Sequence, residues 1–107
     1  MDLKSLAREI KLQNKKLNLL SSGDVAKLEK KHFPDCMEIM EFWKIEKDAK
    51  VLDLGTGGGL PGLVLAVKNS KMEFVLVDSI KKKVSALKSM IKNLKMENIS
   101  AVLGRAE

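Results

Sequence analysis

The stretch that decides the fold is Val-Leu-Asp-Leu-Gly-Thr-Gly-Gly-Gly-Leu-Pro-Gly, residues 51–62. Its first four residues predict a buried strand. The glycines that follow let the backbone turn sharply and lie close to a ligand, because no Cβ prevents positive φ or a close approach. Pro61 suits the first turn of a helix, where a backbone N–H is not needed. The twelve residues therefore predict a strand, a turn that faces a bound small molecule, and a helix that starts at this turn.

The residues after this stretch continue the alternation of helices and strands. A helix is expected over 61–68, and the apolar run over 73–77 is typical of a parallel strand covered on both faces. A long helix capped by Ser79 and a third strand over 99–103 follow. This order predicts three parallel strands with right-handed crossovers, which is the first half of a doubly wound α/β sheet.

The second half of such a sheet normally begins beside the first strand. Nothing after residue 103 in this sequence supplies it, so the first strand is expected to have an uncovered edge. We therefore favour a fragment of a longer protein, whose sheet is truncated after the third strand. The alternative is that another chain covers the edge, which gives an expectation of self-association.

The sequence before the sheet is helical. Apolar residues at helical spacing predict a helix over 3–18, and Ser22-Gly23-Asp24 indicates a turn that starts the next helix. Pro34 is expected to end that second helix. We divide the chain into an N-terminal helical cap, residues 1–49, and the sheet-containing half-domain, residues 50–107.

Composition limits the classes of function. With 107 residues and 45% hydrophobic residues, the chain is one domain at most, with enough apolar side chains for a core. One cysteine, Cys36, and one histidine, His32, exclude an internal disulfide and a cysteine–histidine metal cluster. Cys36 is interpreted as a core residue, and His32 as either structural or RNA-facing, with the structural role favoured. We find no signal peptide and no apolar run that approaches a membrane span, so a cytoplasmic location without membrane contact is expected.

The formal net charge of +6 favours a polyanionic partner. Basic residues recur at helical spacing in two places, which indicates either solvated helix faces or phosphate-binding stripes. They are Lys4, Arg8, Lys11 and Lys15 in the first helix, and Lys81, Lys88, Lys92 and Lys95 in the long helix.

Three nucleotide ligands are considered for the glycine turn. A phosphate-binding Walker loop requires Gly-Lys-Ser/Thr, and the residues after Gly62 are Leu-Val, which excludes it. Gly57, Gly59 and Gly62 match the dinucleotide pattern G-x-G-x-x-G literally. In that pattern the first glycine follows the strand directly, and here other residues intervene, so a nicotinamide dinucleotide is disfavoured by register.

The third ligand is S-adenosylmethionine, which has no pyrophosphate and carries an ammonium, a carboxylate and a sulfonium group. Asp53, ahead of the glycines, can complement its cationic methionine end, while backbone groups at Gly55 and Gly57 supply further contacts. A second acid is expected at the end of the next strand, where it binds both ribose hydroxyls, and Asp78 stands there. The alternative for Asp78 is a simple helix cap, but Ser79 is better placed for that role.

Four segments resemble those of one known family. Residues 52–62 closely resemble motif I of the glucose-inhibited division protein B family, bacterial methyltransferases that modify a guanine N7 in small-subunit (16S) ribosomal RNA. Residues 76–83 and 104–107 resemble its Val-Asp-Ser…Lys-Lys/Arg and Gly-Arg-Ala-Glu segments. Residues 14–19, with His32-Phe33, resemble its N-terminal helical region.

The resemblance implies a Rossmann-like S-adenosylmethionine-dependent methyltransferase fold behind the helical cap, with 16S ribosomal RNA or the small ribosomal subunit as partner. It also implies that Gly55 and Leu60 line the cofactor turn and that Ala106 and Glu107 lie by the adenine. The candidate cofactor-binding residues are thus Gly55, Gly57, Leu60, Asp78, Ala106 and Glu107.

No catalytic or metal-binding residue is expected in this chain. Guanine N7 has a lone pair and no proton to remove, so methyl transfer needs no general base and depends mainly on orientation. The main hypothesis is therefore the cofactor-binding portion of an RNA methyltransferase. The alternative is a non-catalytic module that binds either S-adenosylmethionine or a nucleotide.

Overall fold

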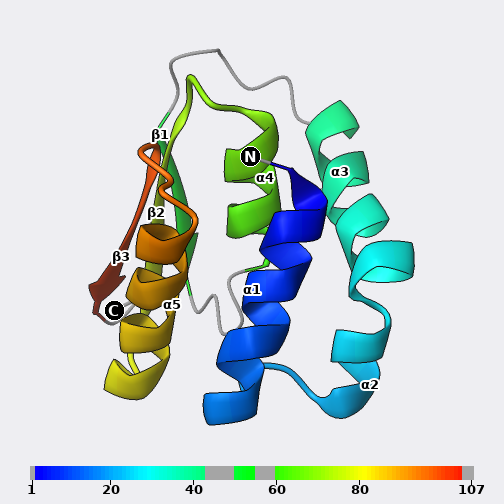
Figure 1. The fold of residues 1–107 in the computed structure, drawn as a ribbon. Helices are drawn as coiled ribbons and strands as arrows, with labels where there is room; N and C mark the ends of the chain where they lie inside the picture. Colours follow the sequence, from blue (N-terminus) through cyan, green and yellow to red (C-terminus); the bar gives the residue numbers. More distant parts are fainter. Residues whose placement is uncertain (1, 43–49, 55–59, 105–107) are drawn as a thin grey trace.

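The computed structural model describes residues 2–42, 50–54 and 60–104 of the chain. Helices come first, and strands then alternate with helices, as the sequence predicts (Figure 1). The elements in chain order are α1 (Leu3–Lys16), α2 (Ser22–Ala26), η1 (Leu28–His32), α3 (Phe33–Phe42), β1 (Lys50–Leu54), α4 (Gly62–Lys68), β2 (Glu73–Asp78), α5 (Lys81–Asn93) and β3 (Ile99–Leu103).

The three strands form a parallel sheet in the order β1-β2-β3. Val51 pairs with Phe74, and Phe74 pairs with Ile99. The predicted strands are confirmed, with bounds that differ by at most one residue at either end. In the described part of the chain, β1 pairs on one side only, which agrees with the expected open edge. Self-association through this edge stays a prediction.

The two faces of the sheet differ in cover. Helices α4 and α5 pack on one face, and α1 packs against both helices, so the described helices lie on the same side (Figure 1). The β2 residues Phe74 and Leu76 point toward these helices and are 1% and 0% exposed. On the opposite face Leu52 is 59% exposed and Val102 is 42% exposed. An apolar sheet face is therefore open to solvent in the described residues.

Helix α1 is held at both ends by side chains. Asp2 accepts a hydrogen bond from the Ser5 N–H at 2.8 Å, which caps the first turn. Near the other end, Asn14 Oδ1 accepts the N–H groups of Leu19 and Leu20 at 2.8 and 2.9 Å. This turn begins at once after the helix, so α1 ends at Lys16 and not at the predicted residue 18.

The expectation that Pro34 ends the second helix is wrong. Helix η1 is a π-helical turn that runs directly into α3, and Pro34 is the second residue of α3. The His32 N–H donates to Lys27 O at 3.1 Å, five residues back. This wider turn changes the hydrogen-bond register just before the proline, which has no N–H to contribute, so the helical path continues.

The start of α2 also differs by one residue. The sequence predicts a turn and cap beginning at Ser22, but the residue that caps α2 is Ser21, whose Oγ accepts the Asp24 N–H at 3.1 Å.

The helices before β1 share one apolar core with α4 and α5. The division of the chain at residue 49 falls where residues 43–49 are not described, and it stays a prediction.

One asparagine joins α4 to β3 at the amino end of the sheet. Asn98 Nδ2 donates to Ala66 O at 2.9 Å and to Asn69 O at 3.0 Å. Two carbonyls near the end of α4 are thereby satisfied by a side chain from the turn before β3.

Among the described helices, none combines the length and the apolar character that a membrane span requires.

Candidate functional site

The candidate site lies at the carboxyl ends of the parallel strands, where ligands of open α/β sheets bind. Strand β1 ends at Leu54 and β2 ends at Asp78, so the two predicted carboxylates come from neighbouring strands at the same edge. In the register, Asp53 is opposite Leu76, and Asp78 is two positions further along β2. The sheet therefore brings Asp53 and Asp78 to one edge, as the sequence predicts.

Asp53 connects β1 to the start of α4. Its Oδ2 accepts a hydrogen bond from the Gly62 N–H at 3.2 Å. This N–H belongs to the first turn of the helix, where backbone donors have no intrahelical partner. Asp53 thus fixes the direction in which α4 leaves the glycine turn, a positioning role in addition to the predicted electrostatic one. The contact of Asp53 with the methionine end of a ligand stays a prediction.

Gly62 allows α4 to pack directly on the sheet. A Cβ on Gly62 would clash with Leu76 Cδ2 and would lie 2.9 Å from Asp53 Oδ2. Leu76 is fully buried, so its side chain cannot move into solvent to make room. Sequence reasoning noted this glycine only within its motif and missed its packing role. The available signal was a glycine directly after Pro61, at the start of a helix that must return over its own strand.

Asp78 lies where β2, α5 and β3 meet. Its side chain is buried, and Oδ1 accepts the Ile80 N–H at 2.9 Å. Its carbonyl oxygen accepts the Gly104 N–H at 3.0 Å, just beyond the end of β3. The side chain and the main-chain carbonyl of Asp78 are therefore both held by hydrogen bonds, which fixes the position of the carboxylate at the carboxyl edge of the sheet.

The prediction that Ser79 caps the long helix is wrong. Helix α5 begins at Lys81, its N-cap is Ile80, and no side chain caps it. The physical reason is competition at this turn: Asp78 takes the Ile80 N–H within a two-residue span, so the chain is still extended at Ile80. Asp78 is accordingly a turn-forming carboxylate, and α5 begins one residue later than Ser79 would have set it.

The other candidate residues divide into two groups. Leu60 is half-buried and packs against the apolar core, and the Leu60–Pro61 peptide bond is cis. The rest lie outside the described residues, so their predicted cofactor contacts stay predictions: Gly55, Gly57, Ala106 and Glu107.

Cys36 and His32 have the surroundings of structural residues. Cys36 is buried, and burial, with a smaller contribution from the charges of Asp35 and Asp53, raises the pKa of its thiol to about 11. His32 Nε2 lies 3.1 Å from Asp24 Oδ1 within the helical cap. Hydrogen bonding from Ser21, followed by His32, lowers the pKa of Asp24. Within the described ranges, His, Cys, Asp and Glu side chains form no group of three or more that could bind a metal ion.

Comparison with known proteins identifies the family. The sequence model of the GidB family, described as rRNA small subunit methyltransferase G, matches residues 1–107. The chain belongs to the GidB family. The suggested resemblance is thereby confirmed, and the match includes the helical cap as well as the strands and the glycine turn of the candidate site.

Curated relatives agree with this assignment. Ribosomal RNA small subunit methyltransferase G of Clostridium tetani is 42% identical over 94 residues, which are 88% of this chain and 39% of the relative. The protein of the same name from Chlorobaculum tepidum is 43% identical over 101 residues, 94% of this chain and 46% of the relative. This GidB-family chain therefore spans less than half the length of these two relatives.

Solved structures confirm the fold class. The crystal structure of coclaurine N-methyltransferase bound to N-methylheliamine and SAH matches with a TM-score of 0.63 and 20% identity. The match covers 68% of this chain and 21% of that one. The GidB-family chain thus has a helical cap followed by three parallel strands of a Rossmann-like methyltransferase fold, and at this identity the likeness concerns the fold alone.

Proposed function

We propose that the protein transfers a methyl group from S-adenosylmethionine to a guanine N7 of 16S ribosomal RNA, and that this chain supplies the cofactor-binding portion. The observation that supports it most directly is the pair of carboxylates, Asp53 and Asp78, at the carboxyl ends of neighbouring strands beside a glycine turn. Asp53, beside the glycine turn, complements the cationic methionine end of S-adenosylmethionine and would repel the pyrophosphate of a dinucleotide, whereas Asp78 fits the ribose of either ligand.

The donor groups at this edge fit S-adenosylmethionine. An ionised carboxylate accepts hydrogen bonds at about four lone-pair positions, so Asp78 can hold the Ile80 N–H and also accept from ribose hydroxyls. Burial and the two backbone hydrogen bonds at Asp78 keep this acceptor in place. Asp53 lies nearer the glycine turn, where the positively charged end of the ligand is expected.

The bound cofactor supplies a methyl group on a sulfonium. In such a transfer the N7 lone pair would form the new carbon–nitrogen bond as the carbon–sulfur bond breaks, with the electron pair of that bond left on sulfur. N7 carries no proton, so the chain needs no general base. Its residues act by holding the donor in line with the acceptor, and orientation of this kind contributes roughly 7–11 kcal/mol to lowering a barrier. A ribosomal RNA substrate also implies the cytoplasm as the location.

The test measures cofactor binding and methyl transfer with the full-length protein. Calorimetry with S-adenosylmethionine and with NAD compares wild type, Asp78→Asn, and Asp35→Asn as a control at an exposed acid. Loss of a charge-assisted hydrogen bond in Asp78→Asn is expected to weaken S-adenosylmethionine binding about 10- to 100-fold, while Asp35→Asn binds as wild type. Binding of NAD in preference to S-adenosylmethionine would contradict the proposal.

The position and nature of the product are tested separately. Purified 16S ribosomal RNA and small ribosomal subunits are incubated with isotopically labelled S-adenosylmethionine and the enzyme. Labelled N7-methylguanine in the digested RNA is the expected product. Cofactor binding without any methyl transfer to either RNA substrate would favour the alternative, a non-catalytic binding module.

A further inference from the structure

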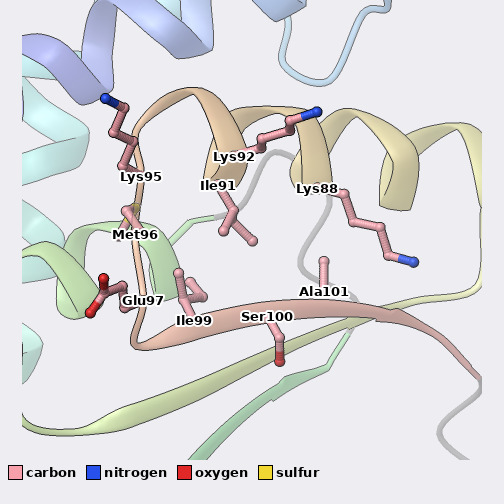
Figure 2. A pocket seen from close by; sticks show the side chains of 9 residues that line it. All are labelled: Lys88, Ile91, Lys92, Lys95, Met96, Glu97, Ile99, Ser100 and Ala101. Carbon is pink, nitrogen blue, oxygen red and sulfur yellow. The ribbon is translucent and has the colours of Figure 1, made fainter.

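An open hollow lies between the second half of α5 and the first half of β3, with a volume of about 440 Å³. Ile91 projects from α5 toward β3, while Ile99 and Ala101 project from β3 toward α5 (Figure 2). Ile99 and Ala101 are buried and Ile91 is half-buried, so the floor of the hollow is apolar. The hollow is at the amino half of β3, away from the carboxyl edge where Asp78 lies.

The charged residues that line the hollow are three lysines and one glutamate, Glu97, so its net charge is positive. Lys88 and Lys92 come from α5, and Lys95 comes from the turn that follows it (Figure 2). Lys88 and Lys92 are four residues apart on α5, about 6 Å along its axis, and Lys95 follows the end of the helix, where its ammonium group points away from the other two (Figure 2). None of the three forms an ion pair with a residue in the described ranges. Lys11 on α1, in contrast, lies 3.6 Å from a carboxylate oxygen of Glu29.

Lys95 occupies a position that favours glycine. Its φ is 53°, in the left-handed region, and the Met96 N–H donates to Ile91 O at 3.1 Å to end the helix. Glycine usually fills this position because it has no Cβ to oppose the left-handed conformation. Lysine at this position has an unfavourable backbone conformation, and its side chain adds a third positive charge to the rim. Like charges four residues apart, as in Lys88 and Lys92, are also mildly unfavourable without an anion nearby.

A nucleic-acid strand has the chemistry that this surface fits. Its phosphates can contact the ammonium groups, and the apolar parts of its sugars and bases can lie against the apolar floor. The floor has no aromatic side chain on which a base could stack, so the expected binding is dominated by the backbone and independent of sequence. Lys81, which belongs to the same basic stripe, is the first residue of α5 and lies near Asp78 in the chain.

We propose that the hollow rimmed by Lys88, Lys92 and Lys95 is a second RNA-binding surface, which holds the phosphate backbone of the substrate away from the methyl-transfer edge. This inference rests on the proposed function, because it takes the substrate to be RNA. The 13 residues of α5 would then connect the two sites over about 20 Å. The surface anchors the RNA, and the carboxyl edge performs the chemistry.

The size of the effect follows from counterion release. Each phosphate contact contributes about −0.7 to the slope of log K against log [salt] for a single strand. Three contacts give a slope change of about 2 and, at 0.15 M salt, an affinity loss of about 50-fold. Neutralising the three lysines is therefore expected to raise KM for RNA strongly and to change kcat little.

The experiment uses the full-length protein and 16S ribosomal RNA over a range of salt concentrations. The variant K88Q/K92Q/K95Q is compared with the control K27Q/K30Q/K31Q, which removes the same charge from exposed lysines of the helical cap. The variant K88R/K92R/K95R keeps the charge and is expected to bind as wild type. Affinity for S-adenosylmethionine, measured for every variant, is expected to be unchanged and reports correct folding.

The outcomes separate this inference from the proposed function. If wild type methylates the RNA and the two glutamine variants lose affinity equally, only net charge matters and the second surface is refuted. Binding to polyglutamate, a mimic of an acidic protein, is measured for the same variants. If K88Q/K92Q/K95Q loses binding to polyglutamate but not to RNA, the surface belongs to an acidic protein partner, which also overturns the inference. If wild type itself transfers no methyl group to RNA, the proposed function fails independently of these lysines.

Discussion

The substitution Gly62→Ala tests the packing that places α4 at the candidate site. The added methyl group would clash with Leu76 Cδ2, which is fully buried, and would crowd the Asp53 carboxylate. Overpacking of a core costs about 1–3 kcal/mol, and weakening the charged hydrogen bond between Asp53 and the Gly62 N–H costs about 1.5 kcal/mol more. Alanine regains up to about 1 kcal/mol of helix propensity. We therefore expect a net loss of about 2–3 kcal/mol.

The assay is urea unfolding of the full-length protein, followed by circular dichroism. Gly23→Ala is the matched control, because its Cβ would meet open space, with the nearest atom, Ser21 Oγ, 4.0 Å away. The control is expected to be neutral or more stable by about 0.5–1 kcal/mol. The displaced start of α4 is also expected to weaken S-adenosylmethionine binding at least tenfold. Agreement of the two variants within about 0.5 kcal/mol would refute the packing argument.

Two further predictions concern residues away from the carboxyl edge. The Cys36 thiol, 7% exposed and with its pKa raised from 9.0 to about 11, has roughly 100-fold less thiolate at pH 8 than an ordinary thiol. Alkylation of its peptide, followed by mass spectrometry, should be at least 100-fold slower in native protein than in urea, and a ratio below tenfold would contradict its burial. Asn98→Ala removes two hydrogen bonds to the end of α4 and is expected to cost about 2 kcal/mol in urea unfolding. Asn18→Ala, at an exposed position, is the control, and an equal loss in both variants would show that Asn98 does not join α4 to β3.

The strands were predictable because their signal is strong and local. The apolar run before Asp78 and the strand before the glycine turn each fit one element only, and their order along the chain sets the parallel sheet. The same order placed Asp78 at the correct edge. The assignment of a specific ligand needed chemistry as well as pattern, and the family resemblance provided the substrate class.

The errors came from competition between neighbouring groups. A proline within a helix is readily interpreted as its end, but a π-helical turn at His32 changed the register before Pro34. The Ser79 hydroxyl is of a type that caps helices, but the Asp78 carboxylate accepts the Ile80 N–H and the chain stays extended at Ile80. The packing of Gly62 and the hollow beside β3 depend on contacts between elements far apart in sequence, which periodicity does not report.

The strand order has a consequence for how the candidate site is built during folding. Val51 pairs with Phe74 and Phe74 pairs with Ile99, so each pairing closes a loop of roughly 25 residues. These pairings are non-local and parallel, so each loop must close before its strand contacts can stabilise it, and pairing of this kind is slow. The carboxyl edge that carries Asp53 and Asp78 is therefore complete only once β1 and β2 have paired, and a ligand that binds there stabilises the folded state over the unfolded one.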